Sequence, residues 1–369
     1  MTTTRLRRTT LNTATSQEVA LHRIGWSATG AVANPYLPWD TPKAIKDAMV
    51  LYYDIAKQKA TNKSMAVNPT LKDLSGNGND ATCYNFAWSG MSGIGGYDTP
   101  NLVNWQINDL TAIINTINEN KLEIISARIL EQVIRYTFTK GVRKLRLKIT
   151  LASPEKKVRI GFDNAKVQDI TEDGIYEFKF MYSETQDNTI NIGTLGGVTI
   201  EQLPLYPNAL VSDGVNDYCI VWDRYDDEGN LINKKSLVLN KEDGYTIIAK
   251  RKWLDTNNNN INNTFVSKGI ASGIKIETRL FSNNSMYTIS FGATTNIQKE
   301  LSDFIYQTTN SYCGIGITSG DKLDEPMVVL FDNKKAGGWY SSIALYSLII
   351  FNRDLTTDEI EWVKNNLMQ

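Results

Sequence analysis

Asp73-Leu74-Ser75-Gly76-Asn77-Gly78-Asn79-Asp80-Ala81-Thr82 and then Cys83-Tyr84-Asn85-Phe86-Ala87-Trp88 form the stretch that decides the fold. Its first part is a turn sequence, because glycine adopts positive φ without a Cβ clash and Asn and Asp side chains bond to their own backbone. From Thr82 to Ala87, two sets of residues alternate with the period of two that is typical of a half-buried β-strand. The stretch therefore predicts a sharp reversal of the chain that launches a strand.

Three other segments of the sequence belong with this stretch, because all of them resemble blocks of one known fold. They are Leu51-Tyr52-Tyr53-Asp54, Ser212-Asp213-Gly214-Val215-Asn216-Asp217-Tyr218 and Ile343-Ala344-Leu345-Tyr346-Ser347-Leu348-Ile349-Ile350-Phe351-Asn352-Arg353-Asp354-Leu355. Together with residues 71–81, these blocks resemble the opening, the continuation and the closing strand of laminin-G-like, concanavalin A-like jelly rolls. The resemblance implies one jelly roll in two parts, residues 41–96 and 207–369, with residues 97–206 between them.

The intervening residues 97–206 predict a second domain. Short apolar-rich runs, most of them alternating, follow one another with turn residues between several, and such spacing favours an antiparallel β-sandwich. Insertion of a domain is tolerated at an exposed loop, and the glycine-rich residues 89–96 mark that boundary. The runs are residues 122–130, 133–138, 144–149, 158–162, 176–181 and 198–204, and residues 191–197 read as a glycine-rich turn.

Two short helices are predicted. Thr41 is expected to cap a helix over residues 43–49, with Pro42 at its first position. Near the C-terminus, Thr356 and Glu359 have the spacing of a capping box, and the residues that follow place Ile360, Val363 and Leu367 on one helical face. The predicted fold class is all-β: a concanavalin A-like jelly-roll sandwich interrupted by a second antiparallel β-sandwich, with an extended N-terminal arm and a short C-terminal helix.

Composition excludes several classes of partner. The 369 residues include 39 basic and 40 acidic side chains, so no overall charge attracts nucleic acid or an anionic membrane. No apolar run is long enough to span a membrane, and none follows the N-terminal arginines as it would in a secretory signal. Cys83, Cys219 and Cys313 lie far apart without metal-ligand spacing, and we interpret them as small core residues rather than a disulfide framework.

Residues 1–40 have the composition of an arm. The first part is polar, Thr-rich and weakly basic, which is typical either of a docking peptide that orders on a partner or of a frayed terminus. Aromatic residues among Gly and Pro follow, and we expect them to pack on a neighbour. The candidates for anchoring the arm are Arg5, Arg7, Arg8, Trp26, Tyr36 and Trp39.

No catalytic residues are predicted. His22 is the only histidine, so a Ser-His-Asp triad and a multi-histidine metal site are excluded. A glycoside hydrolase would need a close pair of carboxylates on a strand. The acidic clusters at residues 226–228 and at Asp321 with residues 324–325 stand instead in Gly-flanked turns, which favours solvated loop charge.

Two kinds of binding site stay open. Aromatic faces stack on sugar rings, which makes Trp253, Trp222, Trp339 and Tyr340 candidates for glycan binding; the alternative is that they fill the core or an oligomer interface. Calcium prefers oxygen ligands, which makes Asp73, Asn77, Asn79 and Asp80 weak candidates for a calcium site; the alternative is ordinary closure of the turn. No other cofactor is expected.

The whole arrangement of leader, turn, inserted sandwich and closing strand with helix resembles virion appendage proteins, head-fibre or tail, of crAss-like and related phages of gut Bacteroidales. The resemblance implies a non-enzymatic structural protein on the exterior of the virion, a homotrimer. Its arm would dock on other virion proteins, and its sandwiches would project outward and hold host or mucus glycans. The alternatives are a glycan-binding adhesin or carbohydrate-binding surface protein, and a glycosidase or depolymerase.

Overall fold

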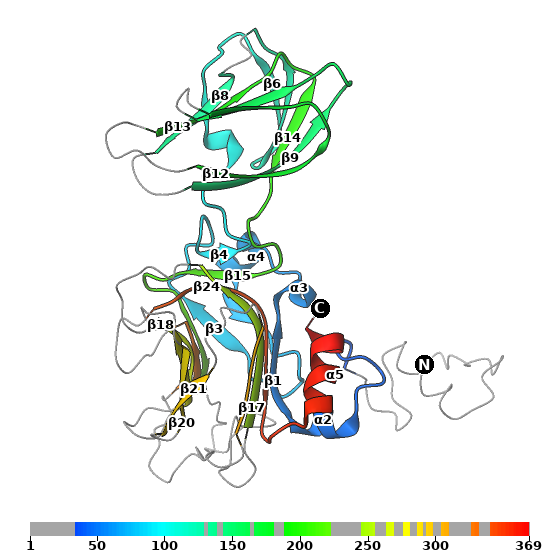
Figure 1. Ribbon diagram of the computed structural model, residues 1–369, viewed down its shortest axis with the longest axis vertical. Helices are drawn as coiled ribbons and strands as arrows, with labels where there is room; N and C mark the ends of the chain where they lie inside the picture. The colour runs from blue at the N-terminus through cyan, green and yellow to red at the C-terminus, as the bar shows by residue number, and fades with distance from the viewer. Residues whose placement is uncertain are drawn as a thin grey trace, which may run out of the picture. The chain divides into compact units, whose positions relative to one another are not determined.

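Figure 1 shows the protein as a computed structural model, built almost wholly from antiparallel β-sheets. The all-β class, the interrupted jelly-roll sandwich and the short C-terminal helix are confirmed, whereas residues 1–33 of the predicted arm lie outside the described residues. The structure describes residues 34–128, 132–138, 143–162, 166–180, 188–222, 245–254, 263–268, 276–280, 286–290, 293–297, 304–309, 326–331 and 340–368.

The chain divides into two compact units. The first comprises Met1–Ala60, Val67–Asn85 and Ser212–Gln369, and the second comprises Thr61–Ala66 and Phe86–Val211. The second unit therefore contains residues 97–206, which the sequence assigns to an inserted sandwich, together with short flanking segments on both sides.

The first sheet of the jelly roll is organised by β24. This strand of ten residues pairs along one side with β17, while β1 and β15 take up its other side. Nearly every side chain of β24 and all of those of β1 are buried. Because both faces of these strands are covered, their sequences are mostly apolar and do not alternate with polar residues. The sheet order is β22 (Phe304–Thr309), β17 (Tyr245–Trp253), β24 (Ser342–Phe351), β15 (Leu210–Asp213) and β4 (Gly93–Ile94), with β1 (Met49–Asp54) on β24.

The second sheet of the jelly roll contains the strand launched by the Asp73 turn. That strand, β3, places Ala81 and Cys83 in the core while Thr82 and Tyr84 are half-buried, so the predicted period of two holds as far as Tyr84. The alternation predicted on to Ala87 is wrong, because Asn85 has a φ of +64° and ends the strand. The order is β2 (Thr70–Leu71), β3 (Ala81–Tyr84), β16 (Tyr218–Trp222), β23 (Pro326–Leu330), β18 (Asn263–Lys268), β19 (Ile276–Leu280), β20 (Met286–Ser290) and β21 (Ala293–Ile297).

The second unit is a sandwich of two five-stranded antiparallel sheets around one apolar core. In β9, for example, Leu145, Leu147 and Ile149 point into that core and charged residues alternate with them. One sheet runs β11 (Lys166–Ile170), β10 (Val158–Phe162), β13 (Asn188–Gly193), β8 (Ile134–Phe138), β5 (Gln106–Ile107). The other runs β12 (Gly174–Phe180), β9 (Arg143–Leu151), β14 (Val198–Gln202), β7 (Lys121–Ser126), β6 (Ile113–Asn118).

One predicted turn in this unit is partly wrong. Residues 191–197 read as a glycine-rich turn, but the first three of them belong to β13 because Ile190 and Ile192 are core residues. The turn itself is made by Gly196 and Gly197, which both have positive φ.

The helices are short. Thr41 does not cap α2 (Lys43–Ala48) as predicted, because its hydroxyl donates to the Pro38 carbonyl at 2.7 Å and Pro42 holds the N-cap position. The capping box of α5 (Thr357–Leu367) is confirmed, and Ile360, Val363 and Leu367 are its buried residues. Further helical turns are α3 (Ile55–Gln58), α4 (Asn62–Val67) and η1 (Leu102–Asn104), and no helix within the described ranges is long and apolar enough to cross a membrane.

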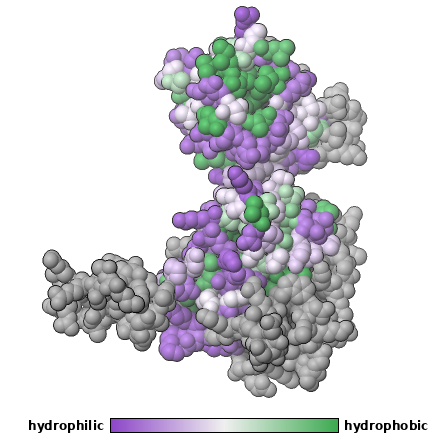
Figure 2. Space-filling model, turned by 180° about the vertical axis from the view of Figure 1, so that it is seen from behind, coloured by the Kyte–Doolittle hydropathy of each residue, from purple (hydrophilic) through white to green (hydrophobic). Residues whose placement is uncertain are grey.

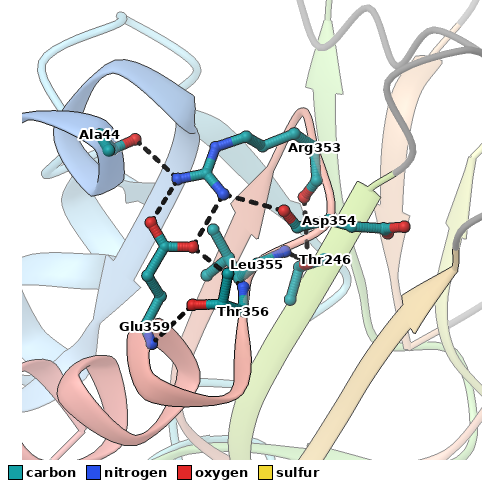
Figure 3. A network of polar contacts seen from close by, with 7 residues as sticks. All are labelled: Ala44, Thr246, Arg353, Asp354, Leu355, Thr356 and Glu359. Atoms are coloured by element: carbon teal, nitrogen blue, oxygen red, sulfur yellow. Dashed lines mark hydrogen bonds and ion pairs between the residues drawn. The ribbon is translucent and has the colours of Figure 1, made fainter.

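A network of polar contacts fixes α5 to the jelly roll (Figure 3). The Arg353 guanidinium donates to both carboxylate oxygens of Glu359, at 2.8 and 2.6 Å, and to the Ala44 carbonyl in α2 at 3.2 Å. The Thr246 hydroxyl of β17 donates to the Arg353 carbonyl and accepts from the Leu355 backbone. Helices and sheet are thus joined around one bidentate ion pair.

This ion pair predicts a loss of stability in acid. Hydrogen bonds from Arg353 hold the pKa of Glu359 at about 2, below its usual 4.5. A lowered folded-state pKa stabilises the fold above the unfolded pKa, so this share is lost as the pH falls from 4.5 towards about 2. We expect Glu359→Gln to cost about 1–3 kcal/mol at neutral pH, after discount for solvent screening, and to flatten the acid limb of denaturant-unfolding curves.

The matched control is Glu361→Gln, because Glu361 lies in the same helix and contacts Lys364 from a more exposed position. Its stability should follow the wild-type pH dependence. Equal acid sensitivity of the wild type and Glu359→Gln would contradict this role of the pair.

Candidate functional site

The edge strand β6 marks the most conspicuous exposed apolar surface of the second unit. It forms a hairpin with β7, closed at Asn118, whose side chain accepts from the Asn120 backbone at 2.9 Å. Ile114 packs on the core, whereas Ile113 beside it is exposed. The outward Asn115 donates to the Glu123 carboxylate of β7 at 3.1 Å. The sheet order ends at β6, and its other edge pairs with no strand among the described residues.

A tight turn before β6 presents Leu110. The buried Asp109 carboxylate accepts from the Thr111 backbone and hydroxyl and, at 2.7 Å, from the Arg128 backbone just after β7. These bonds fix the turn beside the end of β7. Leu110, at its tip, is therefore left exposed.

A second turn, between β13 and β14, meets the same end of β7. The Leu195 carbonyl accepts from the Ala127 backbone, and Gly196 lies so close to β7 that an added Cβ would come within 2.3 Å of the Ile125 carbonyl oxygen. Only glycine, with its φ of +99°, fits there. The turn is thus held against the end of β7, and both Leu195 within it and Ile125 of β7 are exposed.

Five apolar side chains are thus gathered around β6 and the end of β7; we call them the β6 surface. Figure 2 shows hydrophobic residues spread over one face of this unit. Exposed apolar patches of this kind mark sites of protein–protein contact. The members and their exposed fractions are Leu110 90%, Ile113 56%, Ile117 54%, Ile125 46% and Leu195 54%.

The five members of the β6 surface are all aliphatic side chains without a polar group. β6 contains Ile, Asn and Thr without a charge, although charged side chains are the usual protection of an edge strand. Its only protection is irregular pairing, because the register with β7 shifts beside Ile113 and at Ile117. This strand was not predicted from the sequence. Its signal is one Ile pair, Ile113-Ile114, and the single Ile117, with polar residues between them that obscure the alternation.

The four predicted calcium ligands close the turn. Each oxygen of the Asp73 carboxylate accepts two hydrogen bonds, from the backbones of Tyr52, Ser75 and Asn79 and from the Ser75 hydroxyl, all within 2.8–3.0 Å. Asp80 accepts from the Asp73 backbone and the Lys72 ammonium.

The two asparagines of the turn are turned towards β1. The Asn77 and Asn79 side chains donate to the carbonyls of Met49 and Val50. The turn is thus bonded to β1 by carboxylate and amide groups. In the part of the chain that the structure describes, no three His, Cys, Asp or Glu side chains are grouped as metal ligands.

The four aromatic residues predicted as candidates for glycan binding differ in how far they are buried and in how much of them the structure describes. Trp253 is only 7% exposed, and the Arg251 guanidinium carbon lies 4.7 Å from the centre of its ring. This burial favours the alternative that the sequence left open, a core residue, for Trp253. Tyr340 is half-buried. Trp222 ends β16 with only its backbone described, and Trp339 lies outside the described residues.

Two of the anchoring candidates can be located. Tyr36 and Trp39 are 41% and 45% exposed. They lie in residues 34–40, the described end of the arm, which we call the leader. The leader is fixed to the first unit by the buried Leu37 and by the Asn34 amide, which donates to the Leu74 carbonyl at 2.7 Å. Arg5, Arg7, Arg8 and Trp26 lie outside the described residues, as do both acidic clusters that were weighed as carboxylate pairs.

Comparison with known proteins gives no family. No family model matches the sequence, and no curated protein matches it. Among solved structures, Trypanosoma rangeli sialidase aligns with a TM-score of 0.30 at 13% identity, over 42% of this chain and 27% of that chain, so this chain spans little more than a quarter of it.

Two further structures align more weakly. The CBM22-1-CBM22-2 tandem domain of Paenibacillus barcinonensis Xyn10C has a TM-score of 0.18 at 8% identity, over 70% of this chain and 96% of that chain. A structure titled "The Triple Jelly Roll Fold and Turret Assembly in an Archaeal Virus" has a TM-score of 0.16 at 11% identity, over 68% of this chain and 59% of that chain. At these TM-scores the likenesses carry no inference about function.

From its hydrogen bonds we expect the Asp73 carboxylate to stabilise the fold rather than to bind a metal ion. Asp73→Ala removes the acceptor of four hydrogen bonds and should lower the free energy of unfolding by about 2–4 kcal/mol. Asp40→Ala, at an exposed position, is the control and should change little. We expect the thermal midpoint of the wild type to be the same in calcium and in EDTA. A rise with calcium that Asp73→Ala abolishes would show a metal site instead.

Proposed function

We propose that this chain is a non-enzymatic structural protein of a bacteriophage particle, a head fibre or other appendage, and that three copies associate through the β6 surface. The observation that carries the proposal is that surface: five exposed apolar side chains around an edge strand without charge. The resemblance of the sequence blocks to phage appendage proteins supports the particle as its location.

The lack of charge favours copies of this chain as the occupant. At a rotation axis each residue meets its own copies, so any charge there would face a like charge. β6 carries none, and two charges opposite it on β7 are already bonded: Glu123 accepts from Asn115, and Lys121 pairs with Glu201. A neutral apolar strand is therefore suited to an axis.

The free energy that burial of the β6 surface can contribute to association is small. Complete burial of one Leu or Ile side chain is worth about 1.5–3 kcal/mol, and these five are already half-buried on average, which leaves roughly 5 kcal/mol per chain. Association costs about 4–15 kcal/mol in lost freedom. The β6 surface drives assembly together with further contacts around it and is weak by itself.

The leader supports attachment to other virion proteins. It is held on the first unit by the Asn34 hydrogen bond and the buried Leu37, while Tyr36 and Trp39 stay exposed. Aromatic side chains are favoured anchors in protein interfaces. The positions of Trp253, which is buried, and Tyr340, which is half-buried, give no support to sugar binding, and the side chains of Trp222 and Trp339 lie outside the described residues.

The assembly is tested by light scattering coupled to size exclusion. We expect the wild type to have the mass of three chains of 41.4 kDa and Ile113→Asp to have the mass of one. Ile175→Asp is the matched control, since Ile175 is 54% exposed on β12, the opposite edge strand of the same sheet, and should leave the trimer intact. A monomeric wild type, or a trimeric Ile113→Asp variant, would contradict the proposed contact.

The location is tested on particles. Mass spectrometry of gradient-purified, salt-washed phage should detect peptides of this chain, and antibodies to it should label the particle surface in electron micrographs. Peptides found only in the host cell fraction would overturn the assignment to the virion.

A further inference from the structure

Two of the three cysteines meet in the core of the jelly roll. Cys83 of β3 and Cys219 of β16 stand directly opposite each other in the antiparallel pair, and their Sγ atoms are 3.0 Å apart. Both are buried thiols. The sequence analysis placed them in the core, where they are, but 136 positions of separation gave no sign that they touch.

The backbone at this position suits a covalent bond. The Cys83 N–H donates to the Pro69 carbonyl at 2.7 Å, away from β16, so Cys83 and Cys219 form a non-hydrogen-bonded pair. The Cα atoms of such a pair are about 4.5 Å apart, within the range of about 4.4–6.8 Å that a disulfide requires. The sulfur atoms need to approach by only about 1 Å more, which rotation about the Cα–Cβ bonds provides.

From this geometry we infer that Cys83 and Cys219 are a disulfide-forming pair that oxidation closes. The oxidant is a low-molecular-weight disulfide. One cysteine thiolate attacks it, forms a mixed disulfide and releases one small thiol; the second cysteine then attacks the protein sulfur and releases the other. The protein loses two electrons and two protons, which the oxidant gains as two thiols, so the exchange balances.

The surroundings set the rate of the exchange. Burial, with the neighbouring Cys83, raises the pKa of the Cys219 thiol, so few thiolates are present in the closed fold. The bond forms quickly during folding and slowly in the folded protein.

The bond would join the two parts of the split jelly roll. Cys83 comes just before the main segment of the second unit, Phe86–Val211, and Cys219 follows soon after it. The closed loop therefore contains that whole segment, and long loops are those in which a disulfide restricts the unfolded chain most.

The test uses full-length protein with Cys313→Ser, which leaves Cys83 and Cys219 as its thiols. It is refolded in oxidised or in reduced glutathione, denatured, alkylated and weighed intact. We expect no alkyl group and a loss of two hydrogen atoms after oxidation, two alkyl groups after reduction, and a linked peptide pair in the digest. The thermal midpoint should be higher by about 5–15 °C in the oxidised form.

The control adds Cys83→Ser to the same background, and its thermal midpoint should not depend on the redox buffer. Should that variant fail to fold, the intact mass of the Cys313→Ser protein still decides. Two alkyl groups in every buffer, or glutathione bound to one cysteine without linkage to the other, would overturn the inference.

Discussion

The pairing of β3 with β16 is the constraint on which the first unit depends. These strands lie side by side although the main segment of the second unit separates them in the sequence, so the two parts of the jelly roll must find each other after a long excursion. The entropy of closing such a loop grows slowly with its length, so a folded insert is tolerated. The Asp73 turn supports the pairing because it bonds to β1 and delivers β3 to the sheet.

Local sequence signals predicted the parts of the fold that depend on neighbouring residues. The capping box at Thr356 and the alternation in β9 each follow from spacing within a few residues, whereas the closing strand β24 was implied by the resemblance of its block. Thr41 was predicted wrongly as a cap because its hydroxyl has a nearer acceptor in the Pro38 carbonyl, a competition that residue type alone does not reveal.

The features that matter most for the two proposals depend on distant residues. The contact of Cys83 with Cys219 comes from strand pairing across the insert, and the burial of Trp253 comes from packing that an aromatic residue next to an Asn-rich loop does not indicate. The β6 surface combines a hairpin with two turns that meet β7 from different parts of the chain. Only the three-dimensional structure brings such pieces together.

The boundary glycines have a consequence for how this chain can change. Gly93 and Ile94 pair with Val211 and Leu210, and the Gly95 backbone bonds to both Ala209 and Tyr206, so the chain leaves and returns on adjacent strands. Adjacent strands are only about 4.8 Å apart, a span that a tight hairpin turn also bridges. This junction is therefore an insertion point that fixes only the spacing between the two ends of the inserted domain. A domain whose ends meet can take the place of the second unit at this point, so the insert can vary while the strand pairing of the jelly roll stays the same.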